Sequence, residues 1–145
     1  MTYQDVRGQY QKLTHDALVA AGVPADNISF DNYGETAAPA DQSYALIAMN
    51  FGSTVEDVIG CEGVENLLGT LQVNIYTPKQ TGSKPGEDIG LAVIKAWNGM
   101  NKRTYNPTPL LSAHTLGIEG PVTIAPDQRP HHVNVVSCSF RARVA

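Results

Sequence analysis

Hydrophobic residues recur near the N-terminus at the spacing of an amphipathic helix. Five of them follow one another at steps of four, three, four and three residues, which places them on one narrow face. They are Val6, Tyr10, Leu13, Ala17 and Ala20. Gly22 and Pro24 come next, and both residue types commonly end helices. The pattern predicts a helix over residues 3–21 whose apolar face packs against a sheet.

A second helical pattern lies in the back half of the chain. Four apolar residues, Ile89, Val93, Trp97 and Met100, are separated by four, four and three positions. The acidic residues at positions 87 and 88 would lie near the positive end of the helix dipole, where anions are favoured. The spacing therefore predicts a second amphipathic helix over residues 86–100.

Strand patterns occupy much of the sequence between the two helices. Residues 28–30 indicate a short strand, and residues 43–51 are nearly all apolar, as in a strand buried on both sides. A turn at Gly52-Ser53 is expected to follow. Residues 67–76 alternate between apolar and polar positions, which predicts one face on the core and one polar face. The polar positions are Thr70, Gln72, Asn74 and Tyr76.

The C-terminal part of the chain indicates a hairpin and a final long strand. Residues 110–116 and 122–125 flank the turn-forming segment 117–121. Residues 132–144 alternate, and the polar side carries Ser137, Ser139, Arg141 and Arg143. Short connections between neighbouring strands favour antiparallel pairing. We therefore expect one α+β domain over residues 1–145, a two-layer fold in which an antiparallel or mixed β-sheet has two α-helices packed on one face.

The formal charge is divided unevenly along the chain. The net value of -4 excludes the strongly basic surface of a dedicated nucleic-acid binder. Residues 1–75 hold ten acidic and two basic side chains, a charge of -8, whereas residues 76–145 hold four acidic and eight basic ones, a charge of +4. Either the two halves neutralise each other inside one fold, or copies of the chain stack acidic face to basic face.

Cysteine usage and hydropathy exclude several classes of protein. Cys61 and Cys138 are a single pair in a chain with no leader sequence, which favours reduced thiols and an intracellular folding site over a disulfide scaffold. No apolar run approaches the ~20 residues of a membrane span. Membrane, fibrous and solenoid classes are therefore not expected.

The titratable and nucleophilic residues form no recognised catalytic pattern. His131 and His132 would point to opposite faces of a strand, partly exposed at a sheet edge, and cannot easily share one metal ion. No serine lies in a G-x-S-x-G turn, and Cys138 falls on the apolar side of the last strand. The sequence thus predicts a protein that is not an enzyme, with no catalytic residue, cofactor or metal.

The order of segments resembles the tail terminator, or tail completion, proteins of long-tailed bacteriophages. The resemblance depends on the N-terminal helix ending at Gly22-x-Pro24, the strand SYALIAMNF, and the segment GTLQVNIYTP at 69–78. A Gly-rich loop, the helix IGLAVIKAW, a hairpin and a final strand introduced by Pro130 follow in the same order. The likeness covers almost the entire chain.

This resemblance implies a structural virion protein of the tail and neck, assembled in the host cytoplasm. It would form a homohexameric ring on the last ring of tail-tube subunits, stop tube polymerisation, and present a surface to the head-tail connector. DNA would pass through the ring without sequence-specific binding. Such a head-to-tail ring needs heterologous contacts, in which one patch meets a different patch on the next subunit.

Four cations are candidates for interface residues. Lys79 and Lys84 lie in the polar segment 77–88, which is expected to be a long loop, and such loops often bind a partner. Arg141 and Arg143 lie on the polar side of the last strand and are candidates for subunit or tube contact. The alternative is that all four are ordinary solvated cations.

Other functions are compatible with the same sequence. A neck or head-completion protein between portal and tail would share most of these traits. A small cytosolic ligand-binding domain, or an enzyme of unrecognised type, would instead have a concave site with perturbed ionisable groups.

Overall fold

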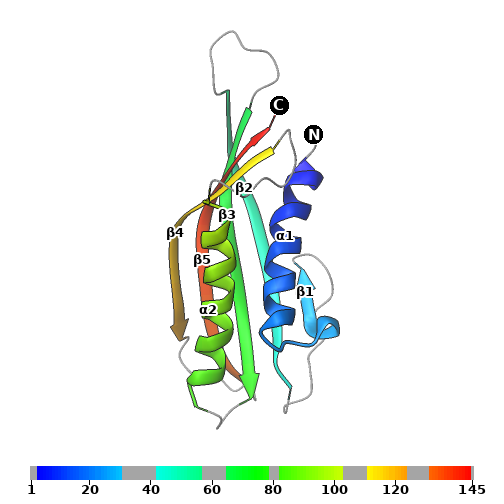
Figure 1. Cartoon of the computed structure of the whole chain (residues 1–145), viewed down its shortest axis with the longest axis vertical. Coiled ribbons are helices and arrows are strands. Elements are labelled where there is room, and N and C mark those ends of the chain that lie inside the picture. Colours follow the sequence, from blue (N-terminus) through cyan, green and yellow to red (C-terminus); the bar gives the residue numbers. More distant parts are fainter. Residues whose placement is uncertain are drawn as a thin grey trace.

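A computed structural model describes residues 3–30, 42–56, 65–78, 82–102, 111–123 and 131–144. Within these ranges the chain forms two α-helices, one short 3-10 helix and five strands (Figure 1). In chain order they are α1 (Tyr3–Ala20), η1 (Ala25–Asn27), β1 (Ile28–Phe30), β2 (Tyr44–Glu56), β3 (Glu65–Pro78), α2 (Lys84–Gly99), β4 (Leu111–Thr123) and β5 (His131–Val144).

The described strands form one mixed sheet in the order β1-β2-β3-β5-β4. Strand β1 is parallel to β2, and the other neighbours are antiparallel. Helices α1 and α2 lie side by side on one face of the sheet (Figure 1). The two-layer α+β fold that the sequence predicts is therefore confirmed.

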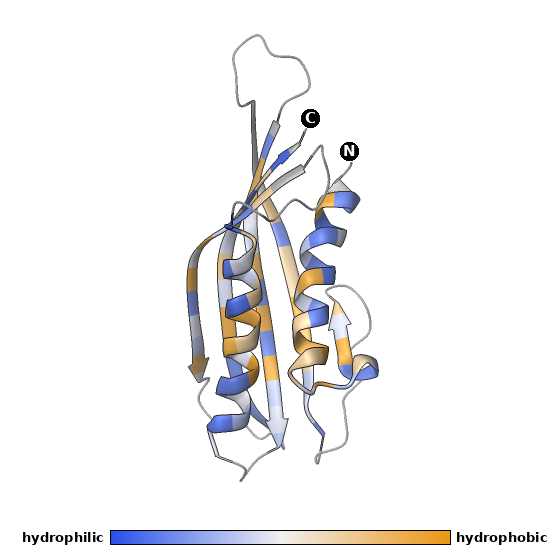
Figure 2. Cartoon of the chain, in the orientation of Figure 1, coloured by the Kyte–Doolittle hydropathy of each residue, from blue (hydrophilic) through white to orange (hydrophobic). Residues whose placement is uncertain are grey.

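The alternation of side chains along the two central strands builds the core. On β3, Leu71, Val73 and Ile75 are fully buried on the side of the helices. Their cross-strand partners on β5 include Val136 and Cys138, which are buried on the same side. Hydrophobic and hydrophilic residues accordingly alternate along the ribbon in Figure 2. Because the side-chain period of a strand is two, the polar positions must occupy the opposite face.

The buried side of α1 differs from the predicted stripe. Val6, Tyr10, Thr14 and Leu18 are fully buried at four-residue steps, whereas the predicted Leu13 is only half-buried and Ala20 is exposed. Hydrophobicity alone favoured Leu13 over Thr14. The buried threonine is accommodated because its hydroxyl is hydrogen-bonded on both sides.

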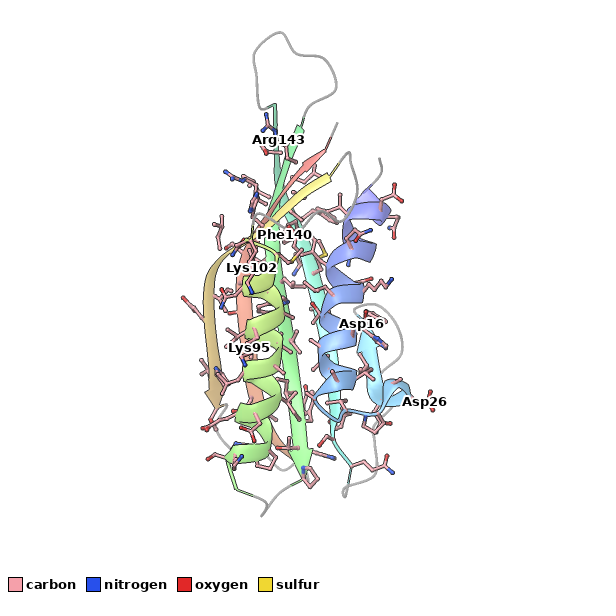
Figure 3. The ribbon with its side chains drawn as sticks, viewed as in Figure 1. Asp16, Asp26, Lys95, Lys102, Phe140 and Arg143 are labelled. Atoms are coloured by element: carbon pink, nitrogen blue, oxygen red, sulfur yellow. The ribbon has the colours of Figure 1, made fainter. Side chains whose placement is uncertain are left out.

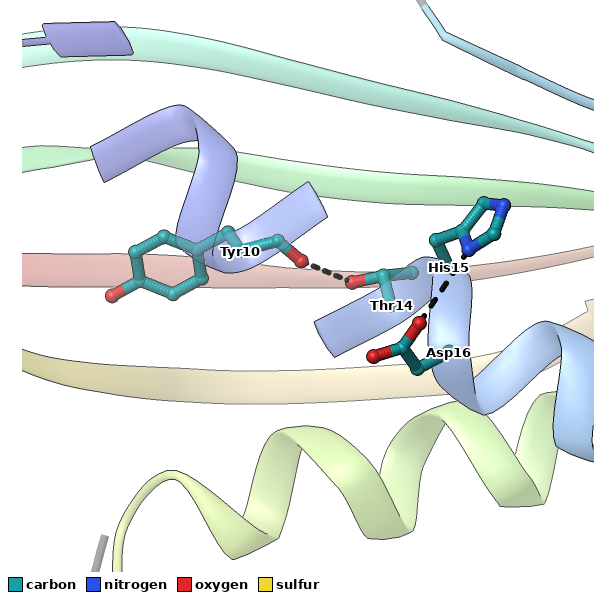
Figure 4. Close-up of polar contacts among 4 residues, drawn as sticks. All are labelled: Tyr10, Thr14, His15 and Asp16. Atoms are coloured by element: carbon teal, nitrogen blue, oxygen red, sulfur yellow. Dashed lines mark hydrogen bonds and ion pairs between the residues drawn. The ribbon is translucent and has the colours of Figure 1, made fainter. Parts of the chain in front are cut away.

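A chain of hydrogen bonds through Thr14 links the two helices. The indole Nε1 of Trp97 donates to Thr14 Oγ1 over 3.0 Å, and Thr14 Oγ1 donates to the Tyr10 carbonyl oxygen over 2.8 Å (Figure 4). On α2, the Trp97 carbonyl oxygen accepts a bond of 2.8 Å from Thr115 Oγ1. These contacts join α1, α2 and β4 through fully or nearly fully buried groups.

The Tyr10 hydroxyl continues the same connection to the sheet. It lies 3.0 Å from the His114 carbonyl oxygen on β4 and 3.1 Å from the Arg141 carbonyl oxygen on β5. Its ring packs against Phe140, with centroids 4.9 Å apart. Residues from α2, β4 and β5 therefore fix the position of α1 on the sheet.

The predicted hairpin at residues 110–125 is wrong. Residues Leu111–Thr123 form one strand, β4, which pairs with β5 along its length. The register shifts by one residue between Leu116 and Glu119 and again between Glu119 and Val122. Gly117 and Gly120 have positive φ angles of 58° and 110°, which glycine adopts without steric cost. The turn-forming residues thus make two bulges in an edge strand, and Figure 1 shows β4 bending along its course.

The predicted turn at Gly52-Ser53 is also a bulge. Strand β2 continues to Glu56, and its register against β3 shifts by one residue between Phe51 and Thr54. Opposite Phe51 lies Gly69, which is covered by the ring of Phe140. A Cβ atom at Gly69 would overlap the Asn50 carbonyl oxygen and lie 2.6 Å from Phe140 Cζ. Glycine is required there because the aromatic ring occupies its side-chain space.

Replacing Thr14 by valine tests the buried hydrogen-bond chain. Thr14→Val keeps the shape of the side chain but leaves the buried indole N–H of Trp97 without its acceptor. We expect a loss of about 1–3 kcal/mol in the free energy of unfolding, measured by urea denaturation. Thr14→Ser retains the hydroxyl and should lose less. Equal stability of Thr14→Val and the unmodified protein would contradict this role.

Candidate assembly surfaces

One face of the sheet has no described helix over it. Its side chains are those that alternate away from the core on β3 and β5. The exposed ones include Thr70, Gln72, Ser139, Arg141 and Arg143. The predicted division of these two strands into a core face and a polar face is confirmed for Thr70, Gln72, Ser139, Arg141 and Arg143, but is wrong for Tyr76, which is 4% exposed because its ring stacks on Tyr44. The surface follows two long strands of the sheet.

Arg141 and Arg143 lie together at one end of this open face. They are two residues apart on β5, so their side chains lie on the same face of the sheet. Ala142, between them, points to the other face and is buried in the core. Arg141 is aligned with Leu68 on β3 and with His114 on β4. Figure 3 shows Arg143 where the strands extend beyond the helices. The structure thus brings together the two arginines that the sequence singled out.

The other end of the open face is aromatic. Tyr44 and Tyr76 are cross-strand neighbours whose rings stack 4.2 Å apart with an interplanar angle of 4°. His131 meets the Tyr44 ring edge-on at 4.8 Å, and its Nε2 lies 2.9 Å from the Gln42 carbonyl oxygen. The prediction of exposed edge-strand histidines is wrong for His131, which is 4% exposed because Tyr44 and Gln42 pack against its ring and β3 pairs with its strand.

The two lysine candidates are not found with the arginines. Residues 79–81, including Lys79, lie outside the described part of the chain. The predicted loop over 77–88 is wrong at both ends. At its start, β3 extends to Pro78, and at its end, α2 already begins at Lys84. Pro85 explains the early start, since proline suits the first helical turn. Figure 1 places this start of α2 at the end of the molecule opposite the C-terminus.

Lys84 also has a partner within its own helix. Its Nζ lies 2.7 Å from Asp88 Oδ2, one helical turn later. The hydrogen bond to Asp88 and the charge of that carboxylate raise the pKa of Lys84 above its ordinary value. Both side chains are exposed, so the pair contributes little to stability.

A groove of about 620 Å³ lies between α2 and the edge strand β4. Leu91, Ile94 and Asn98 line it from α2, and Leu116 and Ile118 line it from β4. Leu91 is 52% exposed and Leu116 is 50% exposed. The first bulge of β4 falls within this lining, because Gly117 is part of it. The groove therefore exposes both apolar and polar surface beside an irregular sheet edge, since Asn98, Asn101 and Thr115 also line it.

Exposed charges differ in position between the two sides of the molecule. Lys95 on α2 and Lys102, just beyond its end, are exposed beside the groove, whereas Asp16 on α1 and Asp26 on η1 are exposed on the other side (Figure 3). Glu119 on β4 and Lys12 on α1 are exposed as well, so neither side carries charge of a single sign. Asp16 Oδ1 lies 3.6 Å from His15 Nδ1 (Figure 4). Sequence reasoning missed these residues, although Leu91, Lys95, Asn98 and Lys102 recur at helical spacing opposite the predicted core stripe of α2.

Seven of the ten acidic residues of the first half are outside this description. They lie in residues 31–41 and 57–64, or at Glu56 and Glu65, whose side chains are not described. The described side chains nevertheless preserve the sign of the charge division. Among the described side chains, those of residues 1–75 sum to -1 and those of residues 76–145 to +2, and the second value comes from Arg141 and Arg143 on the open face.

The remaining chemical features of the described residues can be stated briefly. No group of three or more His, Cys, Asp or Glu side chains is arranged to hold a metal ion in the described ranges. Among the described helices, none combines the length and apolar character needed to cross a membrane.

Comparisons with known proteins identify the fold but not a family. No family model matches the sequence, and no curated protein matches it. A solved structure whose title states no function matches with a TM-score of 0.66 and 18% sequence identity. The match covers 100% of this chain and 98% of the other. At this identity the likeness establishes a shared fold, which extends over the whole chain.

Cys138, which is buried on the core side of β5, provides a test of core packing. Burial raises the pKa of its thiol from 9.0 to about 12. In a Cys61→Ser variant, we expect iodoacetamide at pH 8 to label folded protein at least about a hundredfold more slowly than urea-unfolded protein. Comparable labelling rates in the two states would contradict the buried position.

The same shift predicts a pH dependence of stability. The pKa of the Cys138 thiol is higher in the folded than in the unfolded protein. The stability that the buried, protonated thiol contributes is therefore fully present below the unfolded pKa near 9 and is lost as pH rises towards about 12. The free energy of unfolding should therefore fall over this range. In Cys138→Ala, the free energy of unfolding should decrease less between pH 9 and 12, because the titrating thiol is absent.

Proposed function

We propose that this protein is a structural virion protein that forms a ring on the end of a phage tail tube and stops its growth. The observation that carries the proposal is the open sheet face, with polar and cationic side chains exposed along two central strands. Exposed polar and arginine side chains spread along two strands suit contact with another protein surface. The segment order of the tail terminator proteins points to the same class of partner.

Termination requires that the two faces of the ring differ. One face must match the end of the tail tube, and the other must be unable to accept another ring of tube subunits. In this chain the helices cover one face of the sheet and leave the other open. A ring of such subunits can therefore present chemically different surfaces to the tube and to the head-tail connector.

The arginine end of the open face is the proposed contact with the tube or connector. Arginine is enriched at protein interfaces and pairs with carboxylates through two parallel hydrogen bonds. Arg141 and Arg143 are exposed, and they share the open face. In this proposal DNA passes through the ring without contact to specific bases.

Tube length is the measurement that tests this function. Purified protein is added to polymerising tail-tube subunits, and tube lengths are measured by electron microscopy. We expect shorter tubes with a ring at one end. Tubes of unchanged length, without rings, would contradict the proposal. Binding to finished tails or portal complexes without any effect on length would favour the neck protein instead.

A matched pair of variants tests the arginine contact. Arg141→Glu with Arg143→Glu should weaken capping about tenfold or more, because a cationic contact becomes repulsive. Gln72→Glu with Thr70→Glu adds negative charge elsewhere on the open face and should have a smaller effect. Equal capping by the arginine variant would remove these residues from the contact.

A further inference from the structure

We infer that the groove between α2 and β4 is the docking site for a second copy of this chain, which inserts the outer side of its α1 and η1. The contact is heterologous, because the donor and acceptor surfaces are on opposite sides of one molecule. This inference rests on the proposed ring and assigns the two surfaces that would build it.

The apolar part of the argument comes from the distribution of exposed side chains. Of the four large hydrophobic residues exposed in the described ranges, Leu91, Leu116 and Val122 lie on α2 or β4. The fourth, Val19, is on α1 and is 42% exposed. Leu91 and Leu116 line the same groove. An apolar residue on one side of the molecule therefore has two exposed leucines to contact on the other, in a groove that polar residues also line.

Charge selects the occupant of the groove. Lys95 follows Leu91 by one helical turn, and Lys102 lies next to the lining residue Asn101. Glu119 is exposed between the lining residues Ile118 and Gly120, so two lysines and one acid lie beside the groove. On the opposite side, Asp16 precedes Val19 by three residues on the exposed face of α1, and Asp26 follows on η1. Neither lysine has an ion-pair partner among the residues described. When Val19 of one copy enters the groove of the next, acidic residues meet basic ones.

The edge strand supports the same assignment. Strand β4 is at the end of the sheet, where backbone groups are open to a neighbour, and its two bulges interrupt regular pairing with another strand. A neighbouring helix packed on side chains is therefore favoured over continuation of the sheet. Every copy has both the groove and the α1 surface. An open chain of copies therefore keeps one unoccupied groove and one unoccupied α1 surface at its ends until the ring closes.

Charge reversal tests this pairing through its sign. Lys95→Glu with Lys102→Glu, and separately Asp16→Lys with Asp26→Lys, should each weaken self-association about tenfold or more in sedimentation velocity. Lys12→Glu is the matched control, because the same substitution on the acidic side should leave association unchanged or strengthen it. Circular dichroism checks that each variant is folded.

Restoration is the decisive arm of the experiment. Mixing the two double variants should restore association, since alternating copies again bring opposite charges together at every contact. Combining all four substitutions in one chain should restore it as well. No loss in the double variants, no recovery in the mixture, or an equal loss with Lys12→Glu would overturn the assignment.

Tube capping by the unmodified protein separates this inference from the proposed function. If the unmodified protein caps tubes and the charge variants still self-associate normally, the proposed function is supported and the proposed interface is overturned. Charge-dependent rings that do not alter tube length would support the interface and contradict the function. An unmodified protein that remains monomeric with and without tubes would overturn the interface directly.

Discussion

The buried hydrogen-bond chain through Thr14 is the constraint on which the arrangement of the molecule depends. Two helices share one face of the sheet, and hydrophobic packing alone would allow them to slide. The indole of Trp97 donates to the Thr14 hydroxyl, and the Tyr10 hydroxyl reaches carbonyl groups on β4 and β5. A displaced helix would leave buried polar groups without partners, which is costly. The positions of α1 and α2 are therefore coupled.

Coupled helices give the subunit two fixed and different sides. The side of α1 and η1 carries Asp16, Asp26 and Val19, and the side of α2 and β4 carries Lys95 beside a groove of mixed polar and apolar lining. A closed ring depends on a constant angle between such sides, since small errors accumulate from one contact to the next. The buried hydrogen bonds would thus fix the angle between the two proposed assembly surfaces. In the proposed ring, the open sheet face would make the contacts along the tube axis.

Side-chain periodicity predicted most of the fold. Both helices, the short strand at 28–30 and the two central strands are found where the pattern placed them, because burial imposes periods of 3.6 and 2 on the sequence. Thr14 was missed because a polar residue can occupy a core position when its hydrogen bonds are satisfied by distant residues. The glycines of β4 were taken for a turn, since a bulge and a turn need the same positive φ.

The candidate site was harder to predict because it depends on tertiary neighbours. Arg141 and Arg143 followed from strand alternation alone. The groove could not be foreseen, since Leu91 and Leu116 are far apart in sequence and meet only when α2 packs beside β4. Lys84 was assigned to a loop because its segment is polar, although proline and glycine at positions 85 and 86 are compatible with the first turn of a helix.

Disulfide trapping between copies tests the central claim most directly. Val19→Cys and Leu116→Cys are introduced together into a Cys61→Ser background, and the oxidised protein is separated without reductant. The account predicts a ladder of intermolecular species that ends at one closed oligomer, six copies for the proposed ring. Oxidation that yields monomers alone, or crosslinks between identical positions only, would contradict the heterologous contact.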